Sequence, residues 1–411
     1  MDAIRLSALY PAAELPAQRA RYTQAIEYFE NQFGKKEVSL FSAPGRSELC
    51  GNHTDHQKGN VLACAIEKDA IAVAARRADD RVHLLSEGCG TFSVSINDLQ
   101  KRPEEAGTTA ALLRGTLAGL ERRNFSVGGA EIYVESDVLP GSGLSSSAAF
   151  EVLLGAVFSG LYNENALSPL TLAQIGQEAE AEYFGKPCGL LDQLTCATGG
   201  LVQIDFGADI PKVRKLSADF SQFGYALCLT DTRTSHAGLT DAYAAIPKEM
   251  GEIAAHFEKE YLSQVPENTF YAAIPALRDT CGDRAVTRAI HFFSETKRAV
   301  LAANALEGGD FPKFLDIIKA SGASSHKYLQ NITVPGQNRE QGLSLGLCVS
   351  EEILGNRGVC RVHGGGFAGT MQAFVKDEFV PVYKTHMHKL FGEGTCLQTS
   401  VRPVGVTAVI L

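Results

Sequence analysis

The sequence predicts an α+β protein made of two domains. The chain has 411 residues, more than one ordinary hydrophobic core usually accommodates. Strand-like and helix-like segments follow one another without the regular β-α-β alternation of a doubly wound sheet. The pattern also changes around Phe206, where a strand gives way to a loop with a proline. We therefore expect an N-terminal domain over residues 1–206 and a C-terminal domain over residues 207–411.

The first half combines long helices with short alternating strands. Residues 19–34 place apolar side chains at helical spacing and end on a glycine, which is typical of an amphipathic helix. Residues 37–46 read as a strand that enters a Pro-Gly turn. The next expected elements are strands at 70–77, 81–86, 91–96 and 130–138, a helix at 110–123, and a long apolar helix that begins near Leu144.

The second half continues with mixed elements. A strand is expected at 225–232, before a group of helices and a closing series of strands. The helices are expected at 285–306, 311–319, 341–354 and near Tyr383, and the later strands at 358–362, 370–375 and 404–411.

Composition excludes several classes of partner. The net charge is −9 and no dense basic stretch occurs, which argues against nucleic acid or an anionic membrane. A phosphorylated ligand is still compatible with this charge, because a few cations and backbone amides suffice to bind phosphate.

The sequence shows no sign of a membrane-spanning helix or of secretion. The most apolar run, 152–162, is far shorter than the ~20 residues of a spanning helix. The ten cysteines form no C-x-x-C pair, and the start lacks the pattern of a secretory signal, so we expect a cytoplasmic protein. Separately, we expect a monomer or a weak homo-oligomer.

A glycine-serine loop between residues 138 and 158 gives the strongest local signal. Gly141 and Gly143 allow the backbone to turn tightly and approach a ligand. Three serines, Ser145 to Ser147, then open a helix whose free amides and positive dipole end favour an anion. A serine N-cap after a flexible turn explains the same residues without a ligand, so the loop alone leaves both interpretations open.

Residues 46–60 form a second unusual segment, "RSELCGNHTDHQKGN". It contains one guanidinium, two carboxylates, two imidazoles and several amides between apolar neighbours. This variety predicts a loop that binds a small polyhydroxylated molecule.

The segment 364–369, "GGGFAG", matches G-x-G-x-x-G, which is typical of a dinucleotide site. A strand is expected after it, so we instead expect a turn that packs close to backbone or to a ligand.

These segments together resemble the galactokinase branch of the GHMP small-molecule kinases. Four motifs carry the resemblance in the same order: "APGRSELCGNHTDHQKGNVL", "PGSGLSSSAA", "GKPCGLLDQ" and "GGGFAG". The resemblance implies a GHMP kinase fold of two α+β domains, with the active site in the cleft between them. It also implies transfer of a phosphoryl group from ATP to the anomeric C1 hydroxyl of galactose or a close relative.

The resemblance implies a role for each matching residue. Arg46 and Asp192 match the catalytic positions: the arginine would stabilise charge on the phosphoryl group, and the aspartate would accept the hydroxyl proton or only orient the hydroxyl. The neighbouring arginine should lower the pKa of Asp192. Asp55 is expected to bind two ring hydroxyls at once. The sugar positions are Asn52, His53, Asp55, Gly189 and Tyr243; the ATP positions are Gly141, Gly143, Leu144, Ser145, Ser146, Ser147 and Ala148; the Mg²⁺ positions are Ser147 and Glu180.

Three departures from the family pattern bear on the sugar. The signature glutamate that contacts the C6 end is Asn52, the family asparagine four residues earlier is Glu48, and the usual tyrosine is His56. One hypothesis is that the side chains of Glu48 and Asn52 meet, so the exchange preserves the pair and galactose still binds. The other is that an amide at position 52 admits a C6-modified sugar such as galacturonate, or a pentose such as arabinose.

Two other functions are compatible with parts of the sequence. A sensor that binds sugar and ATP without turnover would be expected to lack a catalytic residue or a phosphate-loop residue. This chain has both kinds of residue, which argues against a sensor. A kinase for a non-sugar alcohol would not need the polar segment at 46–60.

Overall fold

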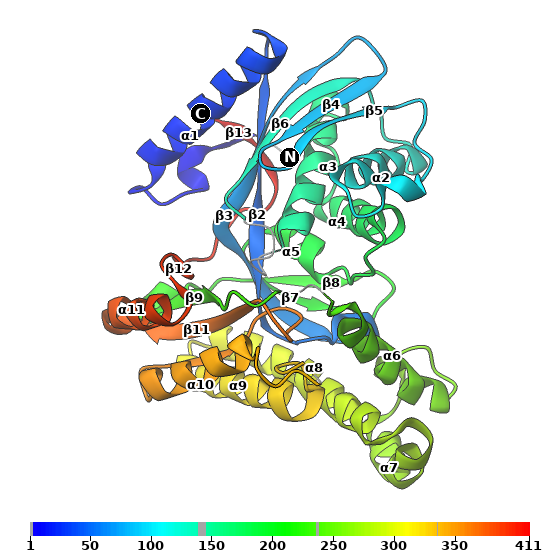
Figure 1. Ribbon diagram of the computed structural model, residues 1–411, viewed down its shortest axis with the longest axis vertical. Coiled ribbons are helices and arrows are strands. Elements are labelled where there is room, and N and C mark those ends of the chain that lie inside the picture. The colour runs from blue at the N-terminus through cyan, green and yellow to red at the C-terminus, as the bar shows by residue number, and fades with distance from the viewer. Residues whose placement is uncertain (1–2, 139–144, 236–237, 335) are drawn as a thin grey trace.

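The computed structural model describes residues 3–138, 145–235, 238–334 and 336–411. Within these residues, strands form one large and one small sheet, stacked along the long axis of the molecule (Figure 1). The large sheet has the order β1-β13-β2-β3-β6-β4-β5, with β7 pairing to β3 and β8. Its strands are β1 (Ile4–Arg5), β2 (Ser39–Cys50), β3 (Asn60–Arg76), β4 (Arg81–Ser86), β5 (Gly90–Ser95), β6 (Ala130–Ser136), β7 (Leu201–Asp205), β8 (Lys212–Leu216) and β13 (Thr407–Ile410).

The long antiparallel pair of β2 and β3 connects the two halves of the molecule, as Figure 1 shows. The predicted Pro-Gly turn is wrong, because β2 runs on through Pro44 to Cys50 and the register shifts between Pro44 and Arg46. A bulge tolerates the missing N–H of proline, so the strand bends without ending. The segment at 46–60 is therefore half strand and half loop, and Arg46 lies in the strand.

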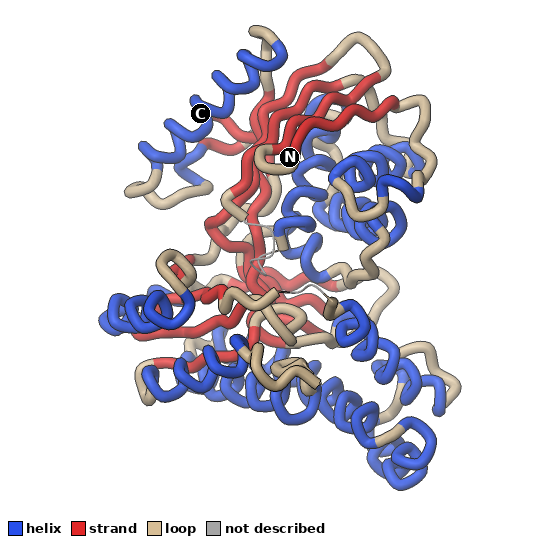
Figure 2. The backbone as a smooth tube through the Cα atoms, in the orientation of Figure 1, coloured by secondary structure: helices blue, strands red, loops and turns tan. Residues whose placement is uncertain are grey.

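Helices cover both faces of the large sheet (Figure 2). One face packs on α2 (Thr109–Arg122), α3 (Ser146–Tyr162) and α5 (Leu191–Thr198), and the other face packs on α1 (Leu15–Phe33). The helix α4 (Pro169–Glu178) packs on α2, α3 and α5. The interior of α3 is almost entirely buried, as its apolar sequence predicts. The predicted helices at 19–34 and 110–123 are confirmed, whereas α4 was not predicted.

The lower half contains a small antiparallel sheet with the order β10-β11-β9-β12. Helices α8, α9 and α10 lie below it in Figure 1, and α11 lies beside β12. The strands are β9 (Tyr225–Asp231), β10 (Gly358–Val362), β11 (Thr370–Lys376) and β12 (Cys396–Thr399). The helices are α6 (Thr240–His256), α7 (Glu267–Cys281), α8 (Asp283–Glu307), α9 (Phe311–Ser324), α10 (Gly342–Leu354) and α11 (Val380–Phe391).

The chain returns to the large sheet at its end. β13 pairs with β1 and β2, so the last strand lies in the upper half beside α1. The division at residue 206 is not tested by this topology and stays a prediction. Within the ranges that the structure describes, no helix is both long and apolar enough to cross a bilayer.

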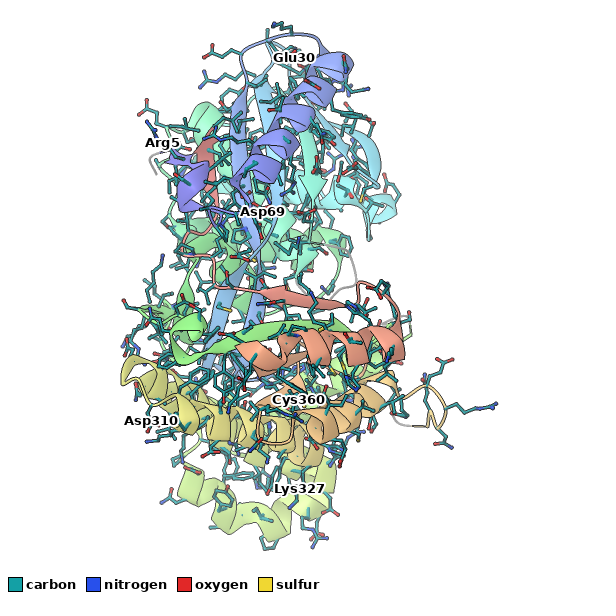
Figure 3. The ribbon with its side chains drawn as sticks, turned by 90° about the vertical axis from the view of Figure 1, so that its left-hand side faces the viewer. Arg5, Glu30, Asp69, Asp310, Lys327 and Cys360 are labelled. Carbon is teal, nitrogen blue, oxygen red and sulfur yellow. The ribbon has the colours of Figure 1, made fainter. Side chains whose placement is uncertain are left out.

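Asp69 ties the two ends of the chain to β3. Its carboxylate is buried and accepts hydrogen bonds from Arg21 of α1 at 2.7 Å, from Arg402 at 2.7 Å and from Tyr10 at 2.5 Å. Figure 3 shows Asp69 beside α1. Burial raises the pKa of Asp69, but Arg21 and Arg402 more than offset this and lower it, so the buried carboxylate stays ionised. Because Asp69 pairs with Pro44 in the sheet, this cluster fixes the bulge that precedes Arg46.

Candidate active site

Folding brings Arg46 and Asp192 together across 146 residues of sequence. Arg46 Nε donates to Asp192 Oδ1 at 2.7 Å, and Arg46 Nη2 donates to Asp192 Oδ2 at 2.8 Å. Arg46 projects from β2, and Asp192 lies in the first turn of α5 as predicted. Burial raises the pKa of Asp192, but the guanidinium more than offsets this and lowers it, as we expected. Since the side chain of Asp192 is 34% exposed, the ionised carboxylate remains accessible to a ligand.

The serines at the start of α3 lie next to this pair. Ser145 donates from Oγ to Asp192 Oδ2 at 2.5 Å, and its φ of 61° turns the backbone just before the helix. Ser146 and Ser147 begin α3, and their amides belong to the first helical turn, where backbone N–H groups have no partner within the helix. The predicted ATP positions Gly141, Gly143 and Leu144 lie outside the described residues. Ala148 is buried in the first turn.

Ser147 and Glu180 meet at the positions that the resemblance assigns to Mg²⁺. Ser147 Oγ donates to Glu180 Oε1 at 2.9 Å, and Glu180 lies in the π-helical turn Ala179–Phe184 that follows α4. A hydroxyl and a carboxylate are the oxygen donors that Mg²⁺ prefers. Among the described residues, no group of three or more His, Cys, Asp or Glu side chains could hold a metal. These two residues therefore fit a cation whose other ligands are phosphate oxygens and water.

Three residues that the sequence analysis missed complete this cluster. Lys186 Nζ lies 2.7 Å from Glu180 Oε1, and Gln193 Nε2 donates to Glu180 Oε2 at 2.9 Å and to Glu151 Oε2 at 3.0 Å. Glu151 is fully buried in α3. Burial and the nearby charge of Glu180 raise its pKa well above the ordinary value. Gln193 thus links the helix that carries Asp192 to both carboxyl groups.

Two of the predicted sugar residues, Asp55 and Gly189, are in direct contact. A Cβ atom added to Gly189 would lie 1.9 Å from Asp55 Oδ2, so only glycine leaves room for this carboxylate. Burial and the charge of Asp192 raise the pKa of Asp55 to about 6. His53 and His56 come from the same loop, with ring centroids 5.6 Å apart.

The side chains of Glu48 and Asn52 meet, as one hypothesis predicted. Asn52 Nδ2 lies 3.1 and 3.2 Å from the two carboxylate oxygens of Glu48, and 2.7 Å from the carbonyl oxygen of Gly364. Asn52 Oδ1 accepts from Asn331 Nδ2 at 2.8 Å and Ser325 Oγ at 3.3 Å. Asn52 is 0% exposed, and these partners use every donor and acceptor of its amide. A direct contact to a sugar stays a prediction and requires one of these bonds to break.

The glycine turn at 364–366 closes over this loop. Its three successive carbonyl oxygens accept hydrogen bonds from Asn52, from His53 Nε2 at 3.0 Å and from Tyr243 OH at 2.6 Å. A Cβ atom added to Gly365 would lie 2.7 Å from Tyr243 Cε1. The prediction of a turn packed closely against its surroundings is confirmed. Three of the five predicted sugar residues thus bond to one turn.

Comparisons with known proteins show sequence signatures and folds that are similar to those of this chain. Residues 27–76 match the galactokinase galactose-binding signature, and residues 111–200 match the N-terminal domain of GHMP kinases. The fold is similar to that of Lactococcus lactis galactokinase complexed with galactose, with 24% identity, a TM-score of 0.81 and coverage of 94% of this chain and 99% of that chain. It is also similar to Methanococcus jannaschii mevalonate kinase, with 16% identity, a TM-score of 0.62 and coverage of 89% and 99%. The fold is that of the GHMP kinases.

Proposed function

Since the chain carries the galactokinase galactose-binding signature and the N-terminal domain of GHMP kinases, we propose that it is an ATP-dependent kinase for the anomeric C1 hydroxyl of galactose. The observation that supports this most is the two-bond pair of Arg46 and Asp192 beside the first turn of α3. Transfer of a phosphoryl group to a hydroxyl requires a fixed cation, an ionised carboxylate and a row of backbone amides.

Each group has a role in this scheme. The amides of the first turn of α3 bind the phosphates of ATP, and Arg46 stabilises charge on the transferring phosphoryl group. Asp192 holds the attacking hydroxyl. Because its pKa is lowered, orientation of that hydroxyl fits Asp192 better than full removal of its proton before attack. Ser147 and Glu180 would hold Mg²⁺, which supplies neutralisation of the phosphate charge when bound.

The loop around Asp55 recognises the sugar. A carboxylate accepts two hydrogen bonds from vicinal hydroxyls, and Asp55 lies against Gly189, close enough to Asp192 for the two charges to interact. We place this site between an N-terminal domain over 1–206 and a C-terminal domain over 207–411, because Tyr243 and the glycine turn reach it from the second half of the chain.

The contact between Glu48 and Asn52 favours galactose over a C6-modified sugar. The exchange keeps one amide and one carboxylate in contact, so the part of the site that is expected to face C6 of the sugar retains both groups. Galacturonate or arabinose remain the alternatives if this pair opens, and a sensor without turnover is the alternative of another class.

A substrate panel tests the proposal. We expect ADP release with Mg-ATP and galactose, and much less with galacturonate, arabinose or N-acetylgalactosamine. Asp192→Asn should lower the turnover number about 10²-fold or more while ATP still binds. Faster turnover of galacturonate would overturn the choice of sugar, and ATP and sugar binding without any ADP release would favour the sensor.

A further inference from the structure

Lys186 places an ammonium group where the metal position is predicted. Its Nζ atom lies 2.7 Å from Glu180 Oε1, the same oxygen that accepts a hydrogen bond from Ser147. The side chain of Lys186 is 61% exposed, whereas that of Glu180 is 3% exposed. The ammonium therefore reaches a buried carboxylate from the solvent side.

The backbone around Gly185 makes this contact possible. The amides of Gly185 and Lys186 donate to the carbonyl oxygen of Glu180 at 3.0 and 3.1 Å, which closes the π-helical turn. Gly185 has a φ of 88°, a left-handed conformation that glycine adopts without strain. The chain reverses direction at Gly185, which brings the side chain of Lys186 into contact with Glu180, six residues earlier in the sequence.

The surrounding charges explain why a cation is needed. The carboxyl groups of Glu180 and Glu151 lie within 3.0 Å of the same nitrogen of Gln193, and both side chains are buried. A buried carboxylate is costly without a paired cation. The ammonium of Lys186 also helps to lower the pKa of Asp192, so it is close enough to the predicted catalytic acid for the two charges to interact.

We propose that Lys186 is a phosphoryl-binding residue that neutralises Glu180 until metal and nucleotide arrive, and then binds the γ-phosphate. An ammonium and a divalent cation repel one another at a single carboxylate oxygen, so the lysine side chain turns toward the phosphate chain of ATP, which the proposed function brings to the same cluster. The exposure of Lys186 leaves room for this rotation. The second step rests on the proposed function, and the first step does not.

Metal binding to the nucleotide-free protein tests the first step. Mn²⁺ alone is titrated and followed by electron paramagnetic resonance. Lys186→Met removes a competing cation, so we expect Mn²⁺ to bind about tenfold more tightly. Lys297→Met is the matched control, because Lys297 is 59% exposed and also paired with a glutamate, Glu267. Unchanged or weaker Mn²⁺ binding in Lys186→Met overturns the first step.

Nucleotide binding and turnover test the second step. Lys186→Met should weaken Mg-ATP binding about tenfold and lower the turnover number about 10²-fold. Lys186→Arg, which keeps the positive charge, should lose less of each, and Lys297→Met should keep both values within about threefold. Wild-type Mg-ATP affinity in Lys186→Met overturns this step. If the wild-type chain phosphorylates no sugar, the proposed function fails, but the Mn²⁺ and Mg-ATP titrations still decide the role of Lys186. Urea unfolding of each variant shows that the fold is intact.

Discussion

Replacement of Gly189 by alanine isolates the contribution of Asp55 to sugar binding. The new Cβ atom would lie 1.9 Å from Asp55 Oδ2, and the carboxylate must retreat by about 1.5 Å to restore an ordinary contact. The φ of Gly189 lies outside the left-handed region, so alanine adopts the same backbone without strain. The substitution therefore moves one carboxylate while the backbone stays in place.

The size of the effect follows from the hydrogen bonds that this movement breaks. A retreat of about 1.5 Å takes a hydrogen bond beyond its useful length. A bond from a hydroxyl to a carboxylate contributes about 2 kcal/mol, so losing one lowers kcat/KM for the sugar about 30-fold, and losing two lowers it about 10³-fold. The KM for ATP should change little, because the three atoms nearest to the new Cβ atom all belong to Asp55.

Steady-state kinetics with each substrate varied in turn separates these effects. Gly251→Ala is the control, since a Cβ atom there meets nothing within 4 Å and alanine suits the interior of α6. If Gly189→Ala retains the wild-type kcat/KM for the sugar, Asp55 does not bind the hydroxyls and this part of the account is wrong. If both substrates lose affinity equally, the substitution has disturbed the whole site.

Two further predictions concern acidic residues. Because the pKa of Asp55 is raised to about 6 and its charged form binds the sugar, kcat/KM should fall as the pH drops through 6. A Glu48→Gln variant removes a second carboxyl whose pKa is raised, to about 7, and should keep this acid limb. Loss of the acid limb in this variant would contradict the assignment to Asp55. Burial raises the pKa of Glu295, but neighbouring cations lower it to about 2. The ionised carboxylate therefore stabilises the folded chain at pH values above its pKa in the unfolded chain, near 4.5. This stabilisation is lost as the pH falls toward 2. Glu295 is buried and accepts from Arg298 at 2.6 Å and from the amide of Gly51 at 3.0 Å, so Glu295→Gln should lower the free energy of unfolding by about 3 kcal/mol at pH 7, and equal urea midpoints would refute this.

Local patterns in the sequence were sufficient for most of the long elements. The helix at 19–34, the strand at 81–86 and the helix at 110–123 match the structure within a few residues, because periodicity and end signals agree there. The helices α6 and α7 were missed. Each contains an internal proline, Pro247 or Pro275, a residue that usually ends a helix, and packing against neighbouring helices overrides that signal.

Long-range contacts explain what could not be predicted in the site. The meeting of Glu48 and Asn52 was predicted because the exchange of two residue types suggested a pair. The return of Lys186 to Glu180 depends on a π-helical turn and a left-handed glycine, and neither has a recognisable pattern in one sequence. Glu151 reads as part of an apolar helix, and its contact with Gln193 joins elements 42 residues apart.

Phosphorus NMR of the reaction products tests the central claim most directly. When the purified chain is incubated with Mg-ATP and galactose, we expect a new phosphate resonance that is split by the anomeric proton, because the phosphoryl group is attached at C1. Release of inorganic phosphate alone, or a phosphate on any other hydroxyl, would contradict the assignment of Arg46, Asp192 and the start of α3 to one anomeric transfer site.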